Sequence, residues 1–368
     1  MGTTREFSFR TALERLAGGG DLTREMASAA MGTIMDGAAT PAQIGALLMG
    51  MRAKGETCEE ITGCAEAIRR RALPVPHGYP DLVDTCGTGG DGASTFNIST
   101  TAAFIVAGAG QKVAKHGNRA ISSQTGSADV LEALGVQVDM AGPEAAGALD
   151  EVGITFLFAP SFHSAMRHAA PVRRELGVRS VFNVLGPLCN PAGATAQIVG
   201  VFDPDLAPVI ARVLGNLGVK RAVVVHGSDG LDELTITGPS RVAEWTGDEV
   251  REYAVDPTVM GVSRGTPESI KGSDPRANAQ ILRDVLEGKP GGPRDVALLN
   301  AGAALMVAGA ARDIRDGVER ARVSIDSGAA LDRLEGLLAY SERLRMREGG
   351  APVRSEMVRG TIPGWGQR

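Results

Sequence analysis

The feature that most constrains the fold of this chain is a regular alternation of short apolar segments and helical segments, which begins after residue 75. Strands are predicted at residues 82–85, 112–115, 136–139, 155–159, 197–202 and 221–226. Helices are predicted at residues 101–109, 127–134, 143–152, 206–217, 294–308, 312–327 and 330–345, and an antiparallel ribbon at 235–255. Strands that alternate with helices are typical of a mostly parallel sheet covered by helices, so the predicted class is α/β with a mostly parallel central sheet.

Residues 8–72 predict a smaller, all-helical part of the chain. Thr40 followed by Pro41 is typical of an N-cap with proline at the first helical position, and Thr57 with Glu60 predicts a capping box. The stretch "RRRALPVPHGYP" interrupts this pattern with three prolines, and we place a domain boundary there, near residue 75. The predicted domains are a helical domain at 1–75, joined by helices from about 162–190, an α/β domain at 76–347, and a tail at 348–368.

Composition excludes several classes of protein. The 368 residues carry a formal net charge of −5, so a general affinity for nucleic acid is not expected. No run approaches the ~20 apolar residues that a membrane span needs, and the charged N-terminus lacks the apolar region of a signal peptide. The four cysteines form no C-x-x-C pair, which argues against a zinc site or a disulfide framework. We therefore expect a cytoplasmic protein with reduced thiols and no nucleic-acid or membrane partner.

A glycine-rich loop follows the first predicted strand. Its residues Gly87, Gly89 and Gly92 match the pattern G-x-G-x-x-G, and a loop of this kind before a helix can close its backbone N–H groups around an anion. A dinucleotide site would carry an acidic residue about 20 residues further on, where this chain has Lys115 and His116. No Gly-Lys-Ser/Thr sequence closes the loop, which excludes a Walker A loop. The loop therefore predicts a phosphate cradle of another kind.

Two further polar loops precede predicted helices. The segments "TFNIST" and "HGNRAISSQTGS" supply hydroxyl and amide side chains, namely Thr95, Asn97, Ser99, Thr100, Asn118, Ser122, Ser123 and Ser127. Loops after successive parallel strands emerge at one edge of a sheet, where α/β proteins bind ligands. Three adjacent loops of this chemistry predict one substrate with several phosphates.

A short acidic loop, "HGSDGLDE", follows the predicted strand at 221–226 and carries Asp229, Asp232 and Glu233. Beside phosphate loops, such carboxylates are suited to hold Mg²⁺, which bridges phosphate oxygens and keeps several waters. The alternative is an Asp-Gly turn with solvated acids, because clustered charges are often structural.

The segments "GTGGD", "TFNIST", "KHGNRAISS", "GSADVLEALG", "FNVLGPLCNPA" and "HGSDGLDE" occur in the order found in the anthranilate phosphoribosyltransferase family, which this chain resembles over about residues 10–345. The resemblance implies a homodimer formed through the helical domain and a reaction between phosphoribosyl pyrophosphate (PRPP) and the amine of anthranilate. It implies that PRPP is surrounded by Gly87, Gly90, Asp91, Thr95, Asn97, Ser99, Thr100, Lys115, Ser123 and Ser127. It implies that Mg²⁺ is held by Ser99, Asp232 and Glu233, and that anthranilate contacts Gly87, Asn118 and Arg173, with His116 near it.

The catalytic assignments are narrower. Lys115 is expected to stabilise the negative charge of the departing pyrophosphate, and His116 is the one general-base candidate by residue type. A local structural role for His116 remains the alternative, because the arylamine needs little activation. Two adjacent arginines, Arg173 and Arg174, point about 100° apart on a helix, and the resemblance selects Arg173 for the carboxylate of anthranilate.

Two rival functions are considered. A pyrimidine nucleoside phosphorylase shares this architecture and uses phosphate and a nucleoside without metal-bound pyrophosphate. A non-catalytic homologue that binds nucleic acid is the second rival. The segments "KHGNRA" and "GLDE" favour the transferase over the first, and the acidic net charge speaks against the second.

Overall fold

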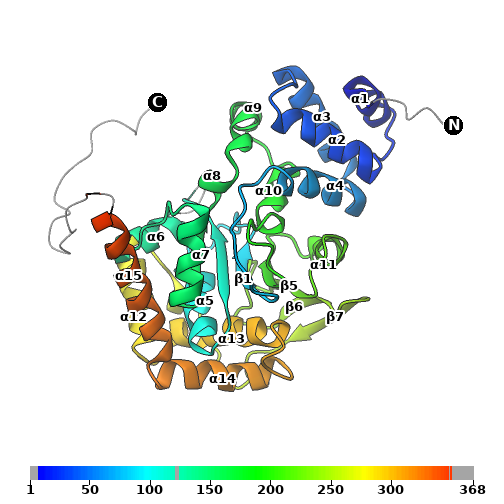
Figure 1. Cartoon of the computed structure of the whole chain (residues 1–368). Helices are drawn as coiled ribbons and strands as arrows, with labels where there is room; N and C mark the ends of the chain where they lie inside the picture. The colour runs from blue at the N-terminus through cyan, green and yellow to red at the C-terminus, as the bar shows by residue number, and fades with distance from the viewer. Residues whose placement is uncertain (1–6, 121–123, 348, 350–368) are drawn as a thin grey trace.

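The computed structural model describes residues 7–120, 124–347 and Gly349. Its centre is a seven-stranded sheet in the order β3-β2-β1-β4-β5-β6-β7 (Figure 1). The strands are β1 (Val83–Gly87), β2 (Val113–Gly117), β3 (Ile154–Phe158), β4 (Ala196–Gly200), β5 (Arg221–Gly227), β6 (Ser240–Trp245) and β7 (Val250–Val255). Strands β1 to β5 pair in parallel, while β6 and β7 are antiparallel additions at one edge. The predicted α/β class with a mostly parallel sheet is therefore confirmed.

The N-terminal part is a bundle of α1 (Phe9–Ala17), α2 (Arg24–Met35), α3 (Pro41–Lys54) and α4 (Cys58–Arg69). Both predicted caps are present. Gln43 N donates to Thr40 Oγ1 at 3.3 Å, and Thr40 N donates to the Gln43 side chain at 2.9 Å, which closes the box at the start of α3. At the start of α4, Glu60 is fully buried and also accepts from Leu22 N and from Lys54 Nζ, so this cap helps to fix the bundle.

Helices cover both faces of the sheet. One apolar core lies under α5 (Ile98–Gly108), α6 (Ser127–Leu134), α7 (Gly142–Glu151), α12 (Pro275–Leu286), α13 (Gly292–Val307), α14 (Ile314–Asp326) and α15 (Ala329–Arg347). The second core lies on the opposite face under α11 (Leu206–Asn216) and continues into the N-terminal bundle, because α4 packs on α11. The helical bundle thus shares one continuous core with the sheet.

A chain segment between β3 and β4 connects the two parts (Figure 1). It consists of the short helices α8 (Ala159–Phe162), η1 (Ser164–His168), α9 (Ala170–Leu176), α10 (Phe182–Leu185) and η2 (Gly186–Leu188). Helix α9 packs on α3 of the bundle and α10 packs on α4. Residues from this segment therefore reach the cavity described below from the side of the helical bundle.

Five of the six strands predicted before the ribbon are present with small shifts of their ends, but the strand predicted at 136–139 is wrong. Val136 and Val138 are buried and Asp139 is exposed, so the expected alternation exists. This segment packs against α15 and does not pair with a strand, and its Gln137 N donates to Ser341 Oγ at 3.0 Å. Helix α12 and the short helix η3 (Pro267–Ile270) were not predicted, because proline and polar residues interrupt the apolar pattern there.

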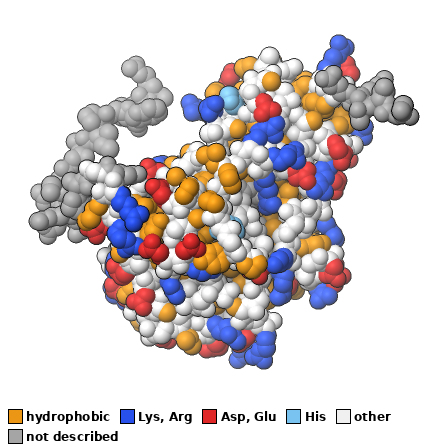
Figure 2. Space-filling model, viewed as in Figure 1, with side chains coloured by type: hydrophobic (Ala, Val, Ile, Leu, Met, Phe, Trp, Pro, Cys, Tyr) orange, Lys and Arg blue, Asp and Glu red, His pale blue; other side chains and the backbone are white. Residues whose placement is uncertain are grey.

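The surface carries charges of both signs. On the face drawn in Figure 2, basic and acidic side chains are interspersed, and hydrophobic side chains gather across the middle of the view. Among the described residues, no helix combines the length and the apolarity that crossing a membrane requires. The predicted tail at 348–368 lies outside the described residues, apart from Gly349.

Candidate active site

Two joined cavities lie at the ends of β1 and β2. The first has a volume of about 340 Å³ and is lined mostly by polar groups of the glycine loop, the start of α5, the loop after β2 and the acidic loop after β5. The second has a volume of about 470 Å³ and lies between β1, β2 and the short helices that lead to the bundle. Residues of β1, β2 and α9 line both cavities, so one wall is common to the two.

The glycine loop is held against the acidic loop by hydrogen bonds from backbone N–H groups to carboxylates and by the close approach of two glycines to Asp232. Gly89 N donates to Asp232 Oδ2 at 2.7 Å, and Asp232 N donates to Asp91 Oδ2 at 3.4 Å. A Cβ on Gly87 would lie 2.5 Å from Asp232 Oδ2, and a Cβ on Gly200 would lie 1.5 Å from the Asp232 carbonyl oxygen. These glycines are therefore required by close approach, and the two loops form one wall of the first cavity.

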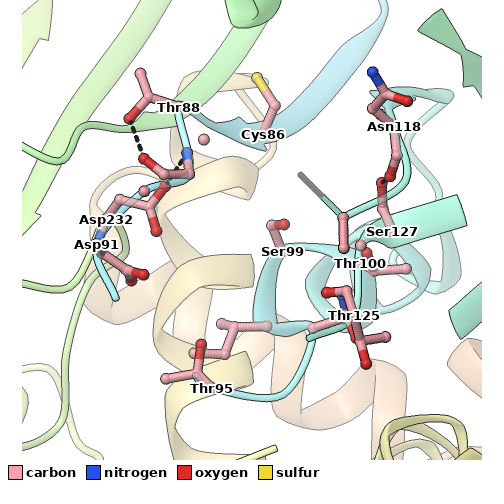
Figure 3. Close-up of a pocket in the computed structure, with 18 of the residues that line it drawn as sticks. Cys86, Thr88, Asp91, Thr95, Ser99, Thr100, Asn118, Thr125, Ser127 and Asp232 are labelled. Atoms are coloured by element: carbon pink, nitrogen blue, oxygen red, sulfur yellow. Dashed lines mark hydrogen bonds between the residues drawn. The ribbon is translucent and has the colours of Figure 1, made fainter. Parts of the chain in front are cut away.

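This wall is strongly acidic. Burial raises the pKa of Asp232 well above its usual value, and the charges of Asp91 and Glu233 raise it further. Burial also raises the pKa of Glu233 to about 8, against the opposing effect of the Lys115 ammonium. Figure 3 shows Asp91 and Asp232 on one side of Ser99, with Asn118 and Ser127 on the other. A cation bound beside these buried carboxyls would offset the effect of burial and favour their ionised forms.

Asp229 does not share this wall. Its carboxylate accepts hydrogen bonds from the hydroxyls of Thr235 and Thr237 at 2.7 and 2.6 Å. Asp229 therefore shapes the turn after β5, as the structural alternative for this loop expected, while Asp232 and Glu233 line the cavity.

Lys115 is the buried cation of the site, with 3% of its surface exposed. Its ammonium donates to the Thr85 carbonyl oxygen and, at 3.3 Å, to Ser99 Oγ. Burial lowers the pKa of Lys115 and raises the pKa of Asp84, and each charge opposes the shift of the other. Asp84 is fully buried, and its charge favours the charged form of Lys115 at the cavity wall.

The start of α5 faces the same cavity. Ser99 and Thr100 lie in its first turn, where backbone N–H groups have no partner within the helix and the positive end of the helix dipole favours an anion. Thr100 Oγ1 is buried without a hydrogen-bond partner. The side chain of Asn97 is already engaged, because it donates to the Thr125 carbonyl oxygen at 3.3 Å and accepts from Asn278 at 3.1 Å.

The loop after β2 closes the opposite side of the first cavity. Ser127 Oγ donates to the Asn118 carbonyl oxygen at 3.2 Å (Figure 3). A Cβ on Gly126 would lie 2.4 Å from Ala120 N, so a glycine is needed at the start of α6. The loop therefore presents the first turn of α6 to the cavity.

Two buried histidines line the second cavity. The rings of His116 and His163 pack edge to face with centres 5.2 Å apart. His116 Nδ1 lies 3.2 Å from the Gly186 carbonyl oxygen, which can only accept, so Nδ1 carries the proton and Nε2 is an acceptor without a partner. Burial lowers the pKa of His116 to about 3, and the neighbouring His163 adds to this effect.

The adjacent arginines of α9 differ in their surroundings. The Arg173 guanidinium lies over the Phe182 ring at 4.7 Å and lines both cavities. Burial lowers the pKa of Arg173, which still carries its charge at neutral pH because the usual value is 12.5. Arg174 is exposed and lines neither cavity.

The structure brings nearly all of the residues selected from the sequence to the first cavity. Those on its wall are Gly87, Gly90, Asp91, Thr95, Asn97, Ser99, Thr100, Lys115, His116, Asn118, Ser127, Arg173, Asp232 and Glu233. Ser123 lies outside the described residues. Sequence reasoning missed Arg179, Asn183, Phe202 and Ser273, which also line this cavity. Asn183 lies in the motif "FNVLGPLCNPA" at the start of α10, and this motif was a signal for it. The other three lie in connecting segments without a recognisable motif, and for Arg179 the only signal was its proximity to Arg173 in the chain.

The oxygen donors of the first cavity fit a magnesium ion that completes its shell with substrate and water. Among the described residues, no group of three or more His, Cys, Asp or Glu side chains is arranged to hold a metal ion by itself. Mg²⁺ does not need such a cage, since it is usually bound through one or two carboxylates together with substrate phosphates. Asp232 and Glu233, whose pKa values are raised by burial at the cavity wall, are suited to this mode.

Comparison with known proteins identifies relatives over nearly the whole length. Residues 79–331 match the α/β domain of a glycosyl transferase family, and residues 10–72 match the helical bundle domain of a glycosyl transferase family. An anthranilate phosphoribosyltransferase from Symbiobacterium thermophilum is 56% identical over 336 residues, which cover 91% of this chain and 98% of that protein.

Solved structures similar to this chain are also anthranilate phosphoribosyltransferases. The crystal structure of anthranilate phosphoribosyltransferase from Thermus thermophilus is 44% identical, with a TM-score of 0.85 over 89% of this chain and 98% of that chain. The enzyme from Saccharomyces cerevisiae, solved in complex with PRPP and Mg, is 28% identical, with a TM-score of 0.83 over 91% of this chain and 98% of that chain. Each match covers both the helical bundle and the sheet.

Proposed function

The chain belongs to the anthranilate phosphoribosyltransferase family, and we propose that its two joined cavities carry out the reaction of that family. The enzyme transfers the phosphoribosyl group of PRPP to the amine of anthranilate and releases pyrophosphate, a step of tryptophan biosynthesis. The observation that carries this assignment is the wall shared by a polar cavity and a less polar one. A phosphorylated donor and an aromatic acceptor need such a pair of adjoining sites. The relatives are transferases, which decides against the nucleoside phosphorylase and the nucleic-acid-binding homologue.

We assign PRPP to the first cavity. Its proposed contacts are Gly87, Gly90, Asp91, Thr95, Asn97, Ser99, Thr100, Lys115, Ser123 and Ser127. The first turns of α5 and α6 and the glycine loop offer N–H groups and hydroxyls to phosphate oxygens. Because Asn97 already bonds Thr125 and Asn278, we expect it to shape the cavity or to exchange one of these bonds for the substrate.

The enzyme uses Mg²⁺, for which we propose Ser99, Asp232 and Glu233 as protein ligands. When bound, the ion neutralises charge on the diphosphate as the bond to the anomeric carbon breaks. Lys115 supports the same charge from the floor of the cavity, where low polarity strengthens its effect. Hydrogen bonds to the Thr85 carbonyl oxygen and Ser99 Oγ hold this ammonium in place.

We assign anthranilate to the second cavity. Arg173 would bind its carboxylate, since a guanidinium matches a carboxylate with two parallel hydrogen bonds. Gly87 and Asn118 would lie against the ring or the amine at the common wall. His116 is a weak base, as its lowered pKa indicates, but its Nε2 can accept a hydrogen bond from the amine. We therefore propose that His116 orients the amine lone pair rather than removing a proton before attack.

The test is direct. The protein is incubated with anthranilate, PRPP and Mg²⁺, and the loss of anthranilate fluorescence is followed. Loss that requires all three components supports the assignment, and no loss at any substrate concentration contradicts it.

Three further assignments extend the proposal. We divide the chain into a helical domain at 1–75 with helices from about 162–190, an α/β domain at 76–347 and a tail at 348–368. We propose a homodimer formed through the helical domain, on which Met49 of α3 is exposed, and sedimentation of the purified protein tests it. A cytoplasmic location is supported by four unpaired cysteines.

A further inference from the structure

Two cations at the first cavity, Arg119 and Arg179, have no role in the assignments above. Arg179 lies between α9 and α10, six residues beyond Arg173, and lines the cavity beside the glycine loop. Its guanidinium carbon lies 3.9 Å from the centre of the Phe202 ring, and its Nη2 donates to the Gly90 carbonyl oxygen at 2.6 Å. The side chain thus extends from the segment that leads to the helical bundle onto the loop that cradles phosphate.

The charge of Arg179 is not neutralised by the protein. Within residues 7–120 and 124–347, no carboxylate lies within ion-pair distance of it. Arg119, another cation of the same wall, pairs with Glu132 and Asp129 instead. Lys115 is buried, and its ammonium donates to the Thr85 carbonyl oxygen and Ser99 Oγ. Arg179 is therefore the exposed cation of this wall that retains its full charge for a ligand.

The contacts of the Arg179 guanidinium also fix the orientation of its N–H donors. A guanidinium carries five N–H donors in one plane, and stacking on an aromatic face holds that plane fixed. Gly90 occupies one donor of Arg179, and among the described residues no other acceptor is bonded to the group. The remaining donors lie at the wall of a cavity built for an anion.

We propose that Arg179 is a further substrate-binding residue, which donates to the diphosphate of PRPP while its bond to Gly90 keeps the glycine loop in place. The inference rests on the proposed function, because it takes the ligand of the first cavity to be PRPP. Stacking on Phe202 holds the guanidinium ready before the substrate arrives, which reduces the entropy lost on binding.

Inorganic pyrophosphate with Mg²⁺ is the probe, and isothermal titration calorimetry measures its dissociation constant. Arg179→Gln removes the charge but keeps an amide that can donate to the Gly90 carbonyl oxygen. Arg174→Gln is the matched control, because Arg174 is exposed, lies on α9 and lines neither cavity. We expect Arg179→Gln to weaken pyrophosphate binding about tenfold, and to raise the Michaelis constant for PRPP more than that for anthranilate. Arg174→Gln keeps the parental constants.

Two results would overturn the inference. If Arg179→Gln binds pyrophosphate like the parent while Arg179→Ala binds it weakly, Arg179 acts only by holding the loop. If both variants bind like the parent, Arg179 is outside the site. Failure of the proposed function looks different, since the parent protein itself would then consume no anthranilate in the presence of PRPP and Mg²⁺.

Discussion

The guanidinium carbon of Arg173 lies 4.7 Å from the centre of the Phe182 ring, and this contact directs the side chain to the wall shared by the two cavities. Arg174, the next residue of α9, is exposed. Successive residues of a helix point about 100° apart. Helix α9 therefore directs Arg173 to the cavities and Arg174 to the solvent.

We expect Arg173→Ala to raise the Michaelis constant for anthranilate at least tenfold, or about 1.4 kcal/mol. The half-buried guanidinium is the cation that faces the less polar cavity from α9, so its loss leaves the carboxylate of anthranilate unpaired there. The constant for PRPP should change less. Steady-state kinetics with each substrate varied in turn measures both.

Arg174→Ala is the control for this variant and should keep near-parental kinetics. Loss of anthranilate affinity in the Arg174 variant instead would mean that α9 presents the other arginine to the substrate. Parental affinity in both variants would mean that another group binds the carboxylate.

The acidic wall predicts the response to magnesium. The double variant Asp232→Asn with Glu233→Gln removes two buried carboxyls, whose raised pKa values burial causes and whose ionised forms a bound cation would stabilise. We expect it to need a higher Mg²⁺ concentration for half-maximal rate, and the loss of transition-state stabilisation is on the order of several kcal/mol. Initial rates over a Mg²⁺ titration at saturating substrates measure this.

Asp229→Asn provides the matched control for the metal, because Asp229 belongs to the same loop but bonds Thr235 and Thr237. It should titrate with Mg²⁺ like the parent. A double variant that also titrates like the parent would show that the metal binds elsewhere.

Lys115→Met should impair both catalysis and stability. From the sequence, loss of this cation is expected to affect the use of PRPP more than the fold. Its burial adds a second effect, since methionine leaves the buried Thr85 carbonyl oxygen and Ser99 Oγ without this donor. We expect a raised Michaelis constant for PRPP, a lower turnover and a lower free energy of unfolding in urea. Lys112→Met, at a site that lines neither cavity, is the kinetic control. Unchanged kinetic constants for Lys115→Met would remove Lys115 from the site.

The succession of most strands and helices along the chain and the positions of the polar loops follow from local sequence, whereas the pairing of strands in the sheet and the contacts between loops do not. Ser99 and Lys115 could be selected from the sequence because a hydroxyl at a helix start and a cation at a strand end both indicate phosphate binding. The bond from Gly89 to Asp232 depends on β4 pairing between β1 and β5, which no local pattern specifies. The same holds for Lys115, whose acceptor Thr85 lies on the neighbouring strand.

Two kinds of error have physical causes. The alternation at 136–139 predicted a strand because burial of every second residue has the same appearance whether the neighbour is a strand or a helix. Arg179 and Phe202 were missed because the contact that makes them relevant joins two loops far apart in the chain, and neither loop contains a recognisable phosphate-binding pattern.

The buried His116 predicts a pH dependence of stability. Its folded pKa is about 3, against 6.5 for the exposed group, so between these values the unfolded chain binds a proton that the folded chain does not. The free energy of unfolding therefore falls as the pH decreases through 6.5, by at most about 1.4 kcal/mol per pH unit from this group. Urea denaturation between pH 7.5 and about 5, without substrates, measures the slope, and His116→Asn should make it shallower. Equal slopes in the parent and the variant would show that His116 keeps its ordinary pKa, and its assignment as a neutral hydrogen-bond acceptor would fail.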